Sequence, residues 1–204
     1  MNKRMGMYSS ITTLLGVIGF AISMIVSFDN GSYFFSLIIA WGFVPMVCSF
    51  ASIGSKDSRA AGFSAIAFAS IYVVLVGLVY FAQLTTLRLS ELSEQAVAIL
   101  DYQSLGSLFF NYDLLGYAFM ALATFFIGLT IEPKNKQEKI LKILLLVHGI
   151  FSATCILMPI LGVFNSDMAG GEIIGVLVLE FWCIYFTPIC VLSYFYFKNH
   201  KQNI

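Results

Sequence analysis

Two side chains that can ionise lie well inside apolar stretches of this 204-residue sequence, His148 and Glu180. An ionisable group is costly to place in hydrocarbon, and such residues commonly belong to ion or proton pathways or contact a bound counter-ion. On a helix, Glu180, Cys183 and Thr187 share one face because they are spaced by three and four residues. We therefore predict that this face points into a helix bundle and that the Glu180 carboxyl is hidden among its neighbours.

Two interpretations of Glu180 are open. Its carboxyl can join helices by hydrogen bonding, or it can act as a proton- or cation-coupled site that anchors a cationic ligand. His148 shares a helical face with Ser152 and Cys155, and helix packing is the interpretation that we favour for this histidine. If the last two apolar stretches form a hairpin, His148 and Glu180 lie about 10–14 Å apart along the bundle, so no direct bond between them is expected.

Polar and aromatic side chains also gather where two apolar stretches approach the predicted outer surface. Tyr80 and Gln83 end one stretch and Arg88 follows it, whereas Asp113 and Tyr117 begin the next. These side chains can line an outward-facing cavity for a small molecule or a cation near Glu180. The candidate ligand-binding residues are Glu180, Tyr80, Gln83, Arg88, Asp113 and Tyr117, and the secondary polar positions within the membrane are His148 and Thr187.

This outer cluster has a structural alternative. Tyrosine at a membrane boundary is an ordinary interfacial anchor. Arg88, for its part, can pair with Glu91 or Asp113. In that case the cluster needs no ligand.

The side chains that common enzyme chemistry requires are missing. The sequence has two histidines, and the second, His200, lies in the C-terminal tail, so a histidine-rich metal site inside the membrane is not expected. No H-E-x-x-H motif, phosphate-binding glycine loop or nucleophile elbow is present. No other acid in the apolar stretches can act together with Glu180. We therefore expect no catalytic residue, no metal and no cofactor, and the enzyme class is disfavoured.

Composition excludes a soluble domain. The chain is 59% hydrophobic and 11% charged, with a mean hydropathy of +0.90, whereas soluble chains are about 25% charged. The formal net charge is zero, which gives no reason to expect nucleic acid as a partner. The expected environment is a lipid bilayer.

Six apolar stretches are each long enough to cross about 30 Å of hydrocarbon. We predict an all-α, six-transmembrane helical bundle that forms a single domain over 1–204. An external amphipathic helix is expected within 83–113, between the third and fourth spans, because Leu89, Leu92, Ala96 and Ile99 fall on one face. The predicted spans are 8–28, 33–53, 60–82, 114–131, 140–164 and 173–197.

The basic residues are distributed unevenly between the two predicted sides. Ten of the eleven Lys and Arg residues fall on the side of the termini, and Arg88 alone falls on the other. Because cytoplasmic loops retain Lys and Arg, both termini are expected to be cytoplasmic. The prediction is a multi-pass protein of the plasma membrane, and the frequent Ile, Phe, Lys and Asn favour a bacterial inner membrane.

Two function classes follow from these features. The favoured one is binding or transport of a small molecule or ion through an outward-facing cavity near Glu180. The alternative is a non-catalytic structural, sensory or accessory membrane protein that acts through its external amphipathic segment. The expected partners are the bilayer, a small-molecule or cationic ligand, and either a second copy of the chain or another membrane protein.

Overall fold

The computed structural model describes residues 1–164 and 171–200, and all of its regular elements in these ranges are helices. A short 3₁₀ turn (Lys56–Ser58) precedes α3, and a π-helical segment (Gln83–Leu87) extends it. The helices are α1 (Asn2–Ile25), α2 (Asp29–Ile53), α3 (Arg59–Ala82), α4 (Glu94–Leu100), α5 (Leu108–Thr130), α6 (Lys136–His148), α7 (Ile150–Ile160) and α8 (Gly171–Asn199).

Six helical segments are long and apolar enough to cross a membrane, which confirms the predicted number. Five of them begin before the predicted first residue, and in two of these five a polar side chain caps the start of the helix. The Ser107 hydroxyl accepts a hydrogen bond from the Phe110 amide and starts α5 at Leu108. Asn135 caps α6 in the same way by accepting from the Glu138 amide. Helix therefore extends beyond the apolar stretch in both cases.

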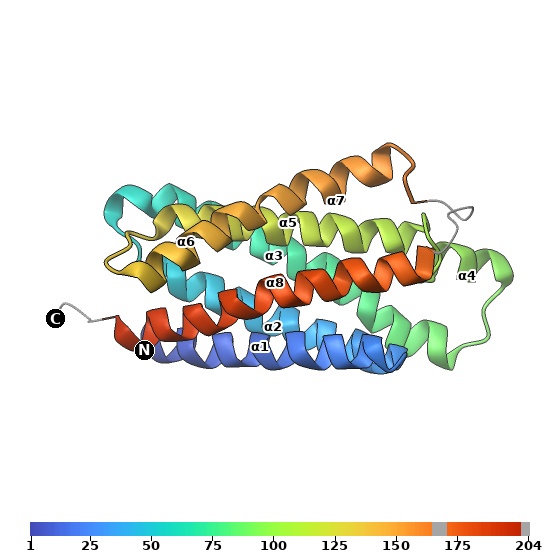
Figure 1. The fold of residues 1–204 in the computed structure, drawn as a ribbon. Helices are drawn as coiled ribbons and strands as arrows, with labels where there is room; N and C mark the ends of the chain where they lie inside the picture. The colour runs from blue at the N-terminus through green and yellow to red at the C-terminus, as the bar shows by residue number, and fades with distance from the viewer. Residues whose placement is uncertain (165–170, 201–204) are drawn as a thin grey trace.

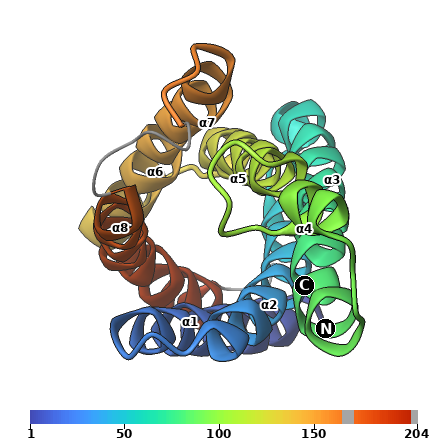
Figure 2. The same cartoon turned by 90° about the vertical axis from the view of Figure 1, so that its right-hand side faces the viewer.

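The helices form a ring when viewed along the bundle (Figure 2). Helix α1 packs most extensively on α2, α3 packs on α5, and the ring closes where α1 lies beside α8. The start of α1 and the end of α8 therefore lie at the same end of the bundle (Figure 1). The short helix α4 lies at the opposite end, which we call the α4 end.

Glycines allow α1 and α2 to approach closely. A β-carbon at Gly16 would lie 2.8 Å from the Ile39 side chain and 2.9 Å from its backbone nitrogen. A β-carbon at Gly42 would lie 2.6 Å from the Thr13 hydroxyl and 2.8 Å from its backbone nitrogen. Small residues at such contacts are the usual basis of helix association in lipid, so these two glycines set the distance between the first two spans.

Helices α6 and α7 divide the predicted fifth span at Gly149. In the described residues α7 packs on α5, whereas α6 contacts α8. Helix α7 tilts away from α8 (Figures 1 and 2), so these neighbours in sequence do not form the packed hairpin that we expected. The segment from Lys136 to Ile160 is the least buried of the six candidate spans.

The connection between the third and fourth spans differs from the sequence prediction. The π-helical segment occupies its beginning, and α4 is only seven residues long and has no buried side chain. The structure does not confirm an amphipathic helix along this connection.

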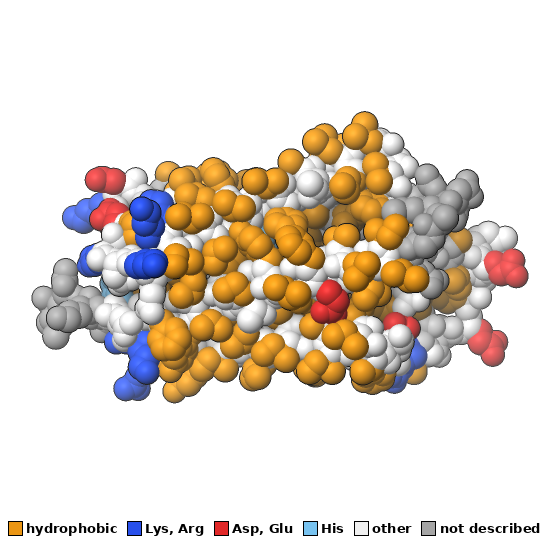
Figure 3. Space-filling view, in the orientation of Figure 1, with side chains coloured by type: hydrophobic (Ala, Val, Ile, Leu, Met, Phe, Trp, Pro, Cys, Tyr) orange, Lys and Arg blue, Asp and Glu red, His pale blue; other side chains and the backbone are white. Residues whose placement is uncertain are grey.

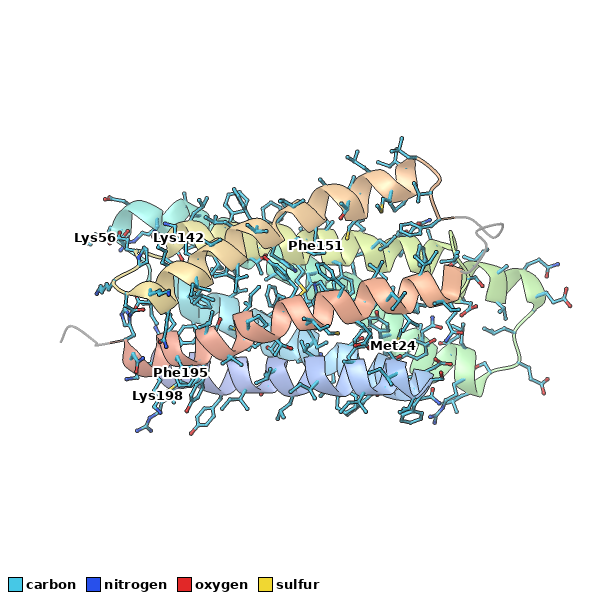
Figure 4. The ribbon with its side chains drawn as sticks, viewed as in Figure 1. Met24, Lys56, Lys142, Phe151, Phe195 and Lys198 are labelled. Carbon is cyan, nitrogen blue, oxygen red and sulfur yellow. The ribbon has the colours of Figure 1, made fainter. Side chains whose placement is uncertain are left out.

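The lateral surface is mainly apolar and the charges gather at the two ends of the bundle (Figure 3). Lys56, Lys142 and Lys198 lie at the end where α1 begins and α8 ends, which we call the basic end, whereas Met24 lies toward the α4 end (Figure 4). An apolar band between charged ends is the arrangement that a multi-pass membrane protein requires.

The close approach of α1 and α2 can be tested with Gly42→Ala. We expect this variant to lower the free energy of unfolding by about 1–3 kcal/mol, because the added methyl group meets the Thr13 backbone. The matched control is Gly77→Ala, since no atom lies within 4 Å of a β-carbon there. Unfolding in mixed detergent micelles measures the difference, and equal stabilities of the two variants would contradict the close contact.

Candidate functional site

A buried carboxyl without a counter-charge lies near the α4 end of the bundle. Asp113, in the second turn of α5, is 3% exposed. Its Oδ1 atom is buried and has no hydrogen-bond partner. No ion pair neutralises this side chain among the described residues, and a buried unpaired polar group is costly.

Three tyrosines surround Asp113 with hydroxyl groups that also lack partners. Tyr72 and Tyr80 come from one face of α3, and Tyr117 lies one turn after Asp113 on α5. Their hydroxyl oxygens are buried without a hydrogen bond. Each is close enough to Asp113 to interact with it electrostatically. The Tyr80 hydroxyl makes no hydrogen bond of normal geometry with the carboxyl among the described residues.

These four side chains form what we call the Asp113 cluster: Tyr72, Tyr80, Asp113 and Tyr117. Six buried side-chain oxygens lack a hydrogen-bond partner in the described part of the chain, and four of them belong to this cluster. Unsatisfied buried polar atoms are rare in proteins, and each calls for a physical explanation such as bound water or a bound ion. Their concentration at one place identifies a site that a ligand would complete.

A small residue brings α3 and α5 together beside the cluster. A β-carbon at Gly116 would lie 2.8 Å from the Val76 side chain. Val76 lies midway between Tyr72 and Tyr80, and Gly116 lies in the turn between Asp113 and Tyr117, next to Tyr117. Because α3 and α5 are in close contact here, Tyr72 and Tyr80 on α3 lie opposite Asp113 and Tyr117 on α5.

The connection after α4 covers the cluster with Tyr102. The Tyr102 ring lies 6.0 Å from that of Tyr33 and 5.3 Å from that of Tyr80, measured between centroids. Gln83 holds this connection in place, since its Nε2 atom donates to the Leu100 carbonyl at 2.8 Å and its Oε1 atom accepts from the Tyr102 amide at 3.4 Å. Burial and the nearby Asp113 raise the pKa of Tyr102, so its hydroxyl stays neutral at physiological pH.

Asp101 organises the same connection. Its carboxylate accepts hydrogen bonds from the Gln103 amide at 3.1 Å and from the Ser104 hydroxyl at 2.7 Å. Its carbonyl accepts from the Ser107 hydroxyl at 2.7 Å. Because Ser107 also caps α5, the cover and the helix that carries Asp113 are joined at one point.

A closed circuit of aromatic contacts lies beneath the cluster. Phe43 contacts Tyr72 and Phe186, at centroid distances of 5.4 and 6.3 Å. Trp182 contacts Phe186 at 5.0 Å and Tyr117 at 5.4 Å. Tyr117 and Tyr72 complete the circuit at 5.7 Å. Helices α2, α3, α5 and α8 are thereby packed around two members of the Asp113 cluster.

His148 has a structural role in this core. Its Nε2 atom accepts a hydrogen bond from Trp182 Nε1 at 3.0 Å, and its Nδ1 atom lies 2.7 Å from the Thr124 hydroxyl. That hydroxyl donates to the Ala121 carbonyl, so it can accept from Nδ1. A neutral ring with its proton on Nδ1 satisfies both bonds. His148 therefore links α5, α6 and α8, and it makes no bond to Glu180.

The structure brings together only part of the predicted outer site. Tyr80, Asp113 and Tyr117 meet in the cluster, and Gln83 holds its cover. Arg88 is exposed to solvent. The remaining two predicted positions, Glu180 and Thr187, lie on α8.

Glu180 is on α8 and its side chain is partly exposed. Figure 3 shows acidic side-chain atoms over this helix, within the apolar band. Its Oε1 atom is buried without a partner. The carboxyl makes no hydrogen bond or ion pair with the Asp113 cluster among the described residues. Thr187 donates to the Cys183 carbonyl of its own helix at 2.8 Å.

Three important side chains were absent from the predicted site. Tyr72 carried a usable signal, because it precedes Tyr80 by two helical turns on the same face. Tyr102 lies in an irregular segment where periodicity gives no information. Trp182 lies next to a predicted inward face, and only its contact with His148 reveals its role.

Comparisons with protein-family models, with curated proteins and with solved structures find no match.

The Trp182–His148 hydrogen bond can be tested with Trp182→Phe. This change keeps an aromatic ring and removes the N–H donor, leaving His148 Nε2 buried without a partner. We expect the free energy of unfolding to fall by about 1–3 kcal/mol. The control is Trp41→Phe, since Trp41 is exposed on the lateral surface. A loss no larger than that of the control would argue against the structural role of His148.

Proposed function

We propose that this protein is a multi-pass membrane protein that binds a small monovalent cation at the Asp113 cluster. The observation that carries this proposal is a buried carboxyl with no counter-charge beside three tyrosine hydroxyls with no partners. Carboxylate and hydroxyl oxygens are suitable ligands for hard cations. The faces of tyrosine rings also attract positive charge, including that of organic ammonium groups.

The charge of the cluster favours a monovalent ligand. Asp113 is the one carboxylate of the cluster, and a single negative charge balances a single positive charge. No group of three or more His, Cys, Asp or Glu side chains suited to a metal ion occurs among the described residues. Divalent cations commonly need more anionic ligands than this cluster supplies.

The proposed orientation follows from the distribution of basic residues. Lysines gather at the basic end (Figure 4), and cytoplasmic loops are rich in Lys and Arg. We therefore propose that both termini face the cytoplasm of a plasma membrane, in the bacterial case the inner membrane. In this orientation the Asp113 cluster lies toward the outer end of the bundle, covered by Tyr102.

A cation site that is closed by Tyr102 is compatible with uptake or transport of the cation. The cation would reach Asp113 only when Tyr102 moves from its position against Tyr33 and Tyr80. The hydrogen bonds of Gln83 would restore the closed position after binding. This proposal keeps the outward-facing site of the sequence prediction and assigns its charge to Asp113 rather than to Glu180.

The proposal is tested by cation-dependent stabilisation of the full chain in phosphatidylcholine nanodiscs. We expect sodium, potassium or tetramethylammonium to raise the unfolding temperature of the wild type in a saturable way. Asp113→Asn should weaken the apparent affinity at least tenfold because the counter-charge is lost. Tyr117→Phe should weaken it less, because one of the proposed oxygen ligands is removed while the ring is kept.

Glu180→Gln is the matched control for Asp113→Asn, since it also neutralises one carboxyl with an unpartnered oxygen. Its affinity should equal that of the wild type. The proposal is wrong if no cation stabilises the wild type, or if Glu180→Gln abolishes the effect while Asp113→Asn retains it.

A second candidate function is an accessory role through the external segment. Leu89, Val97 and Ile99 are exposed there, and α4 has no buried side chain. These apolar groups can contact another membrane protein or a second copy of the chain.

This second function predicts that replacing Leu89 and Ile99 by Gln disrupts self-association or a partner complex. Chemical cross-linking in native membranes measures the complex, and cation-dependent stabilisation in nanodiscs should be unchanged. Equal cross-linking of the variant and the wild type would exclude the role of these two residues.

A further inference from the structure

A crevice of about 210 Å³ lies between the first and last helices, which run side by side in opposite directions. It is lined by three residues of each helix: Ser10, Ile11 and Leu14 from α1, and Cys190, Val191 and Tyr194 from α8. Ile11 is exposed, so the crevice lies at the lateral surface of the bundle. It is smaller than the roughly 300–1,000 Å³ of small-molecule sites, and it suits instead one large side chain of a neighbouring helix.

Glu180 lies along the same two helices, closer to the α4 end. It shares a helical stripe on α8 with Val191 and Tyr194, which follow it by eleven and fourteen residues. The register of the two antiparallel helices, in which Phe197 packs at Gly6, puts Glu180 level with the end of α1. We call the lateral surface from the crevice to Glu180 the α1–α8 face.

The exposed side of α1 on this face has the residue spacing of a helix–helix contact. Five exposed apolar residues recur at intervals of four, three, four and three: Ile11, Leu15, Ile18, Ile22 and Ile25. An average spacing of 3.5 residues is that of the contact stripe between helices that wrap around each other. Because Ile11 also lines the crevice, the stripe begins at the crevice and reaches the level of Glu180.

Glu180 gives the α1–α8 face its preference for positive charge. Its Oε1 atom is buried without a hydrogen-bond partner, whereas the side chain as a whole is partly exposed. The carboxyl forms no ion pair within the described ranges. An ionised carboxyl in an apolar band is costly, and a basic group brought beside it would lower that cost.

The position of Glu180 decides between the possible occupants of this face. Helix α8 begins at Gly171, so Glu180 lies about 13 Å along the helix axis, whereas lipid headgroups lie outside the hydrocarbon. A second copy joined at this face by a two-fold axis would bring Glu180 to Glu180. Arg88 of that copy would lie elsewhere, because it follows α3, which packs on α2 and α5. A basic side chain on a transmembrane helix of a different protein meets both the depth and the charge.

We propose that the α1–α8 face docks a transmembrane helix of another membrane protein, and that this helix carries a Lys or Arg within its apolar span. The basic side chain pairs with Glu180. A large apolar side chain about three turns away on the same helix enters the crevice, because Val191 follows Glu180 by that distance. The proposal does not depend on cation binding, since Glu180 makes no hydrogen bond or ion pair with the Asp113 cluster among the described residues.

The test uses a synthetic transmembrane peptide of leucine and alanine with one central lysine, and the same peptide with glutamine at that position. The full chain carries a donor fluorophore at its C-terminus, the peptide carries an acceptor, and both are placed in phosphatidylcholine vesicles. Energy transfer measured against the peptide-to-lipid ratio gives the apparent affinity. The wild type should bind the lysine peptide at least tenfold more tightly than the glutamine peptide, because only lysine forms a charged hydrogen bond with Glu180.

Glu180→Gln should remove this preference. Its matched control is Asp113→Asn, which neutralises the other carboxyl with an unpartnered buried oxygen and should keep the preference. Comparison of the two peptides on the wild type needs no variant, so the test holds even if a variant fails to fold. The proposal is overturned if the wild type does not distinguish the peptides, or if Asp113→Asn removes the preference as Glu180→Gln does.

Val191→Phe tests the crevice, because the larger side chain fills it and should weaken binding of the lysine peptide. The matched control is Val178→Phe, since Val178 is exposed on the opposite side of α8. Equal binding by these two variants would contradict docking at the crevice. Energy transfer between labelled copies of the chain that Val191→Phe abolishes and Val178→Phe retains would place a second copy on this face and overturn the proposal.

Discussion

In hydrocarbon, every polar group must find its partner inside the protein, because no water is available to replace one. Most hydroxyl groups in this bundle meet that requirement within their own helix. Ser10 donates to the Gly6 carbonyl, Thr13 to the Ser9 carbonyl and Ser36 to the Ser32 carbonyl. His148 meets it across helices through Thr124 and Trp182. The Asp113 cluster differs, because its buried oxygens have no hydrogen-bond partner within their own helix or on another described helix.

The core holds two groups of polar side chains. Those around His148 have hydrogen-bond partners within the protein, whereas the Asp113 cluster has unpaired oxygens that a ligand can bind. At His148, both ring nitrogens have partners and the surrounding aromatic rings exclude other groups. At Asp113, the helices are equally well packed, but the buried oxygens are left open. The same α5 helix carries Thr124 and Asp113, so the first network fixes the position of the second. A rigid support of this kind is what a selective binding site needs.

The cover over the Asp113 cluster is organised by short-range chemistry. Asp101 forms a compact turn with Gln103 and Ser104, and Gln83 ties this turn to the end of α3. The two hydrogen bonds of Gln83 join neutral groups and are weak enough to open and re-form. The packing beneath them involves large buried rings and is much harder to disrupt. Motion at this end of the bundle can therefore be confined to the cover.

Composition and charge in the sequence were enough to determine six apolar helices, their number and the separation of charged ends, because these depend on the local solvent preference of each segment. They also indicated that Tyr80, Asp113 and Tyr117 lie at a common level. Tertiary structure alone decided that Glu180 lies at the side of α8, that α7 packs on α5, and that Tyr102 covers Asp113. The physical reason is that a helical stripe shows which residues share a face, whereas the partner of that face depends on the fit of side chains that are distant in sequence.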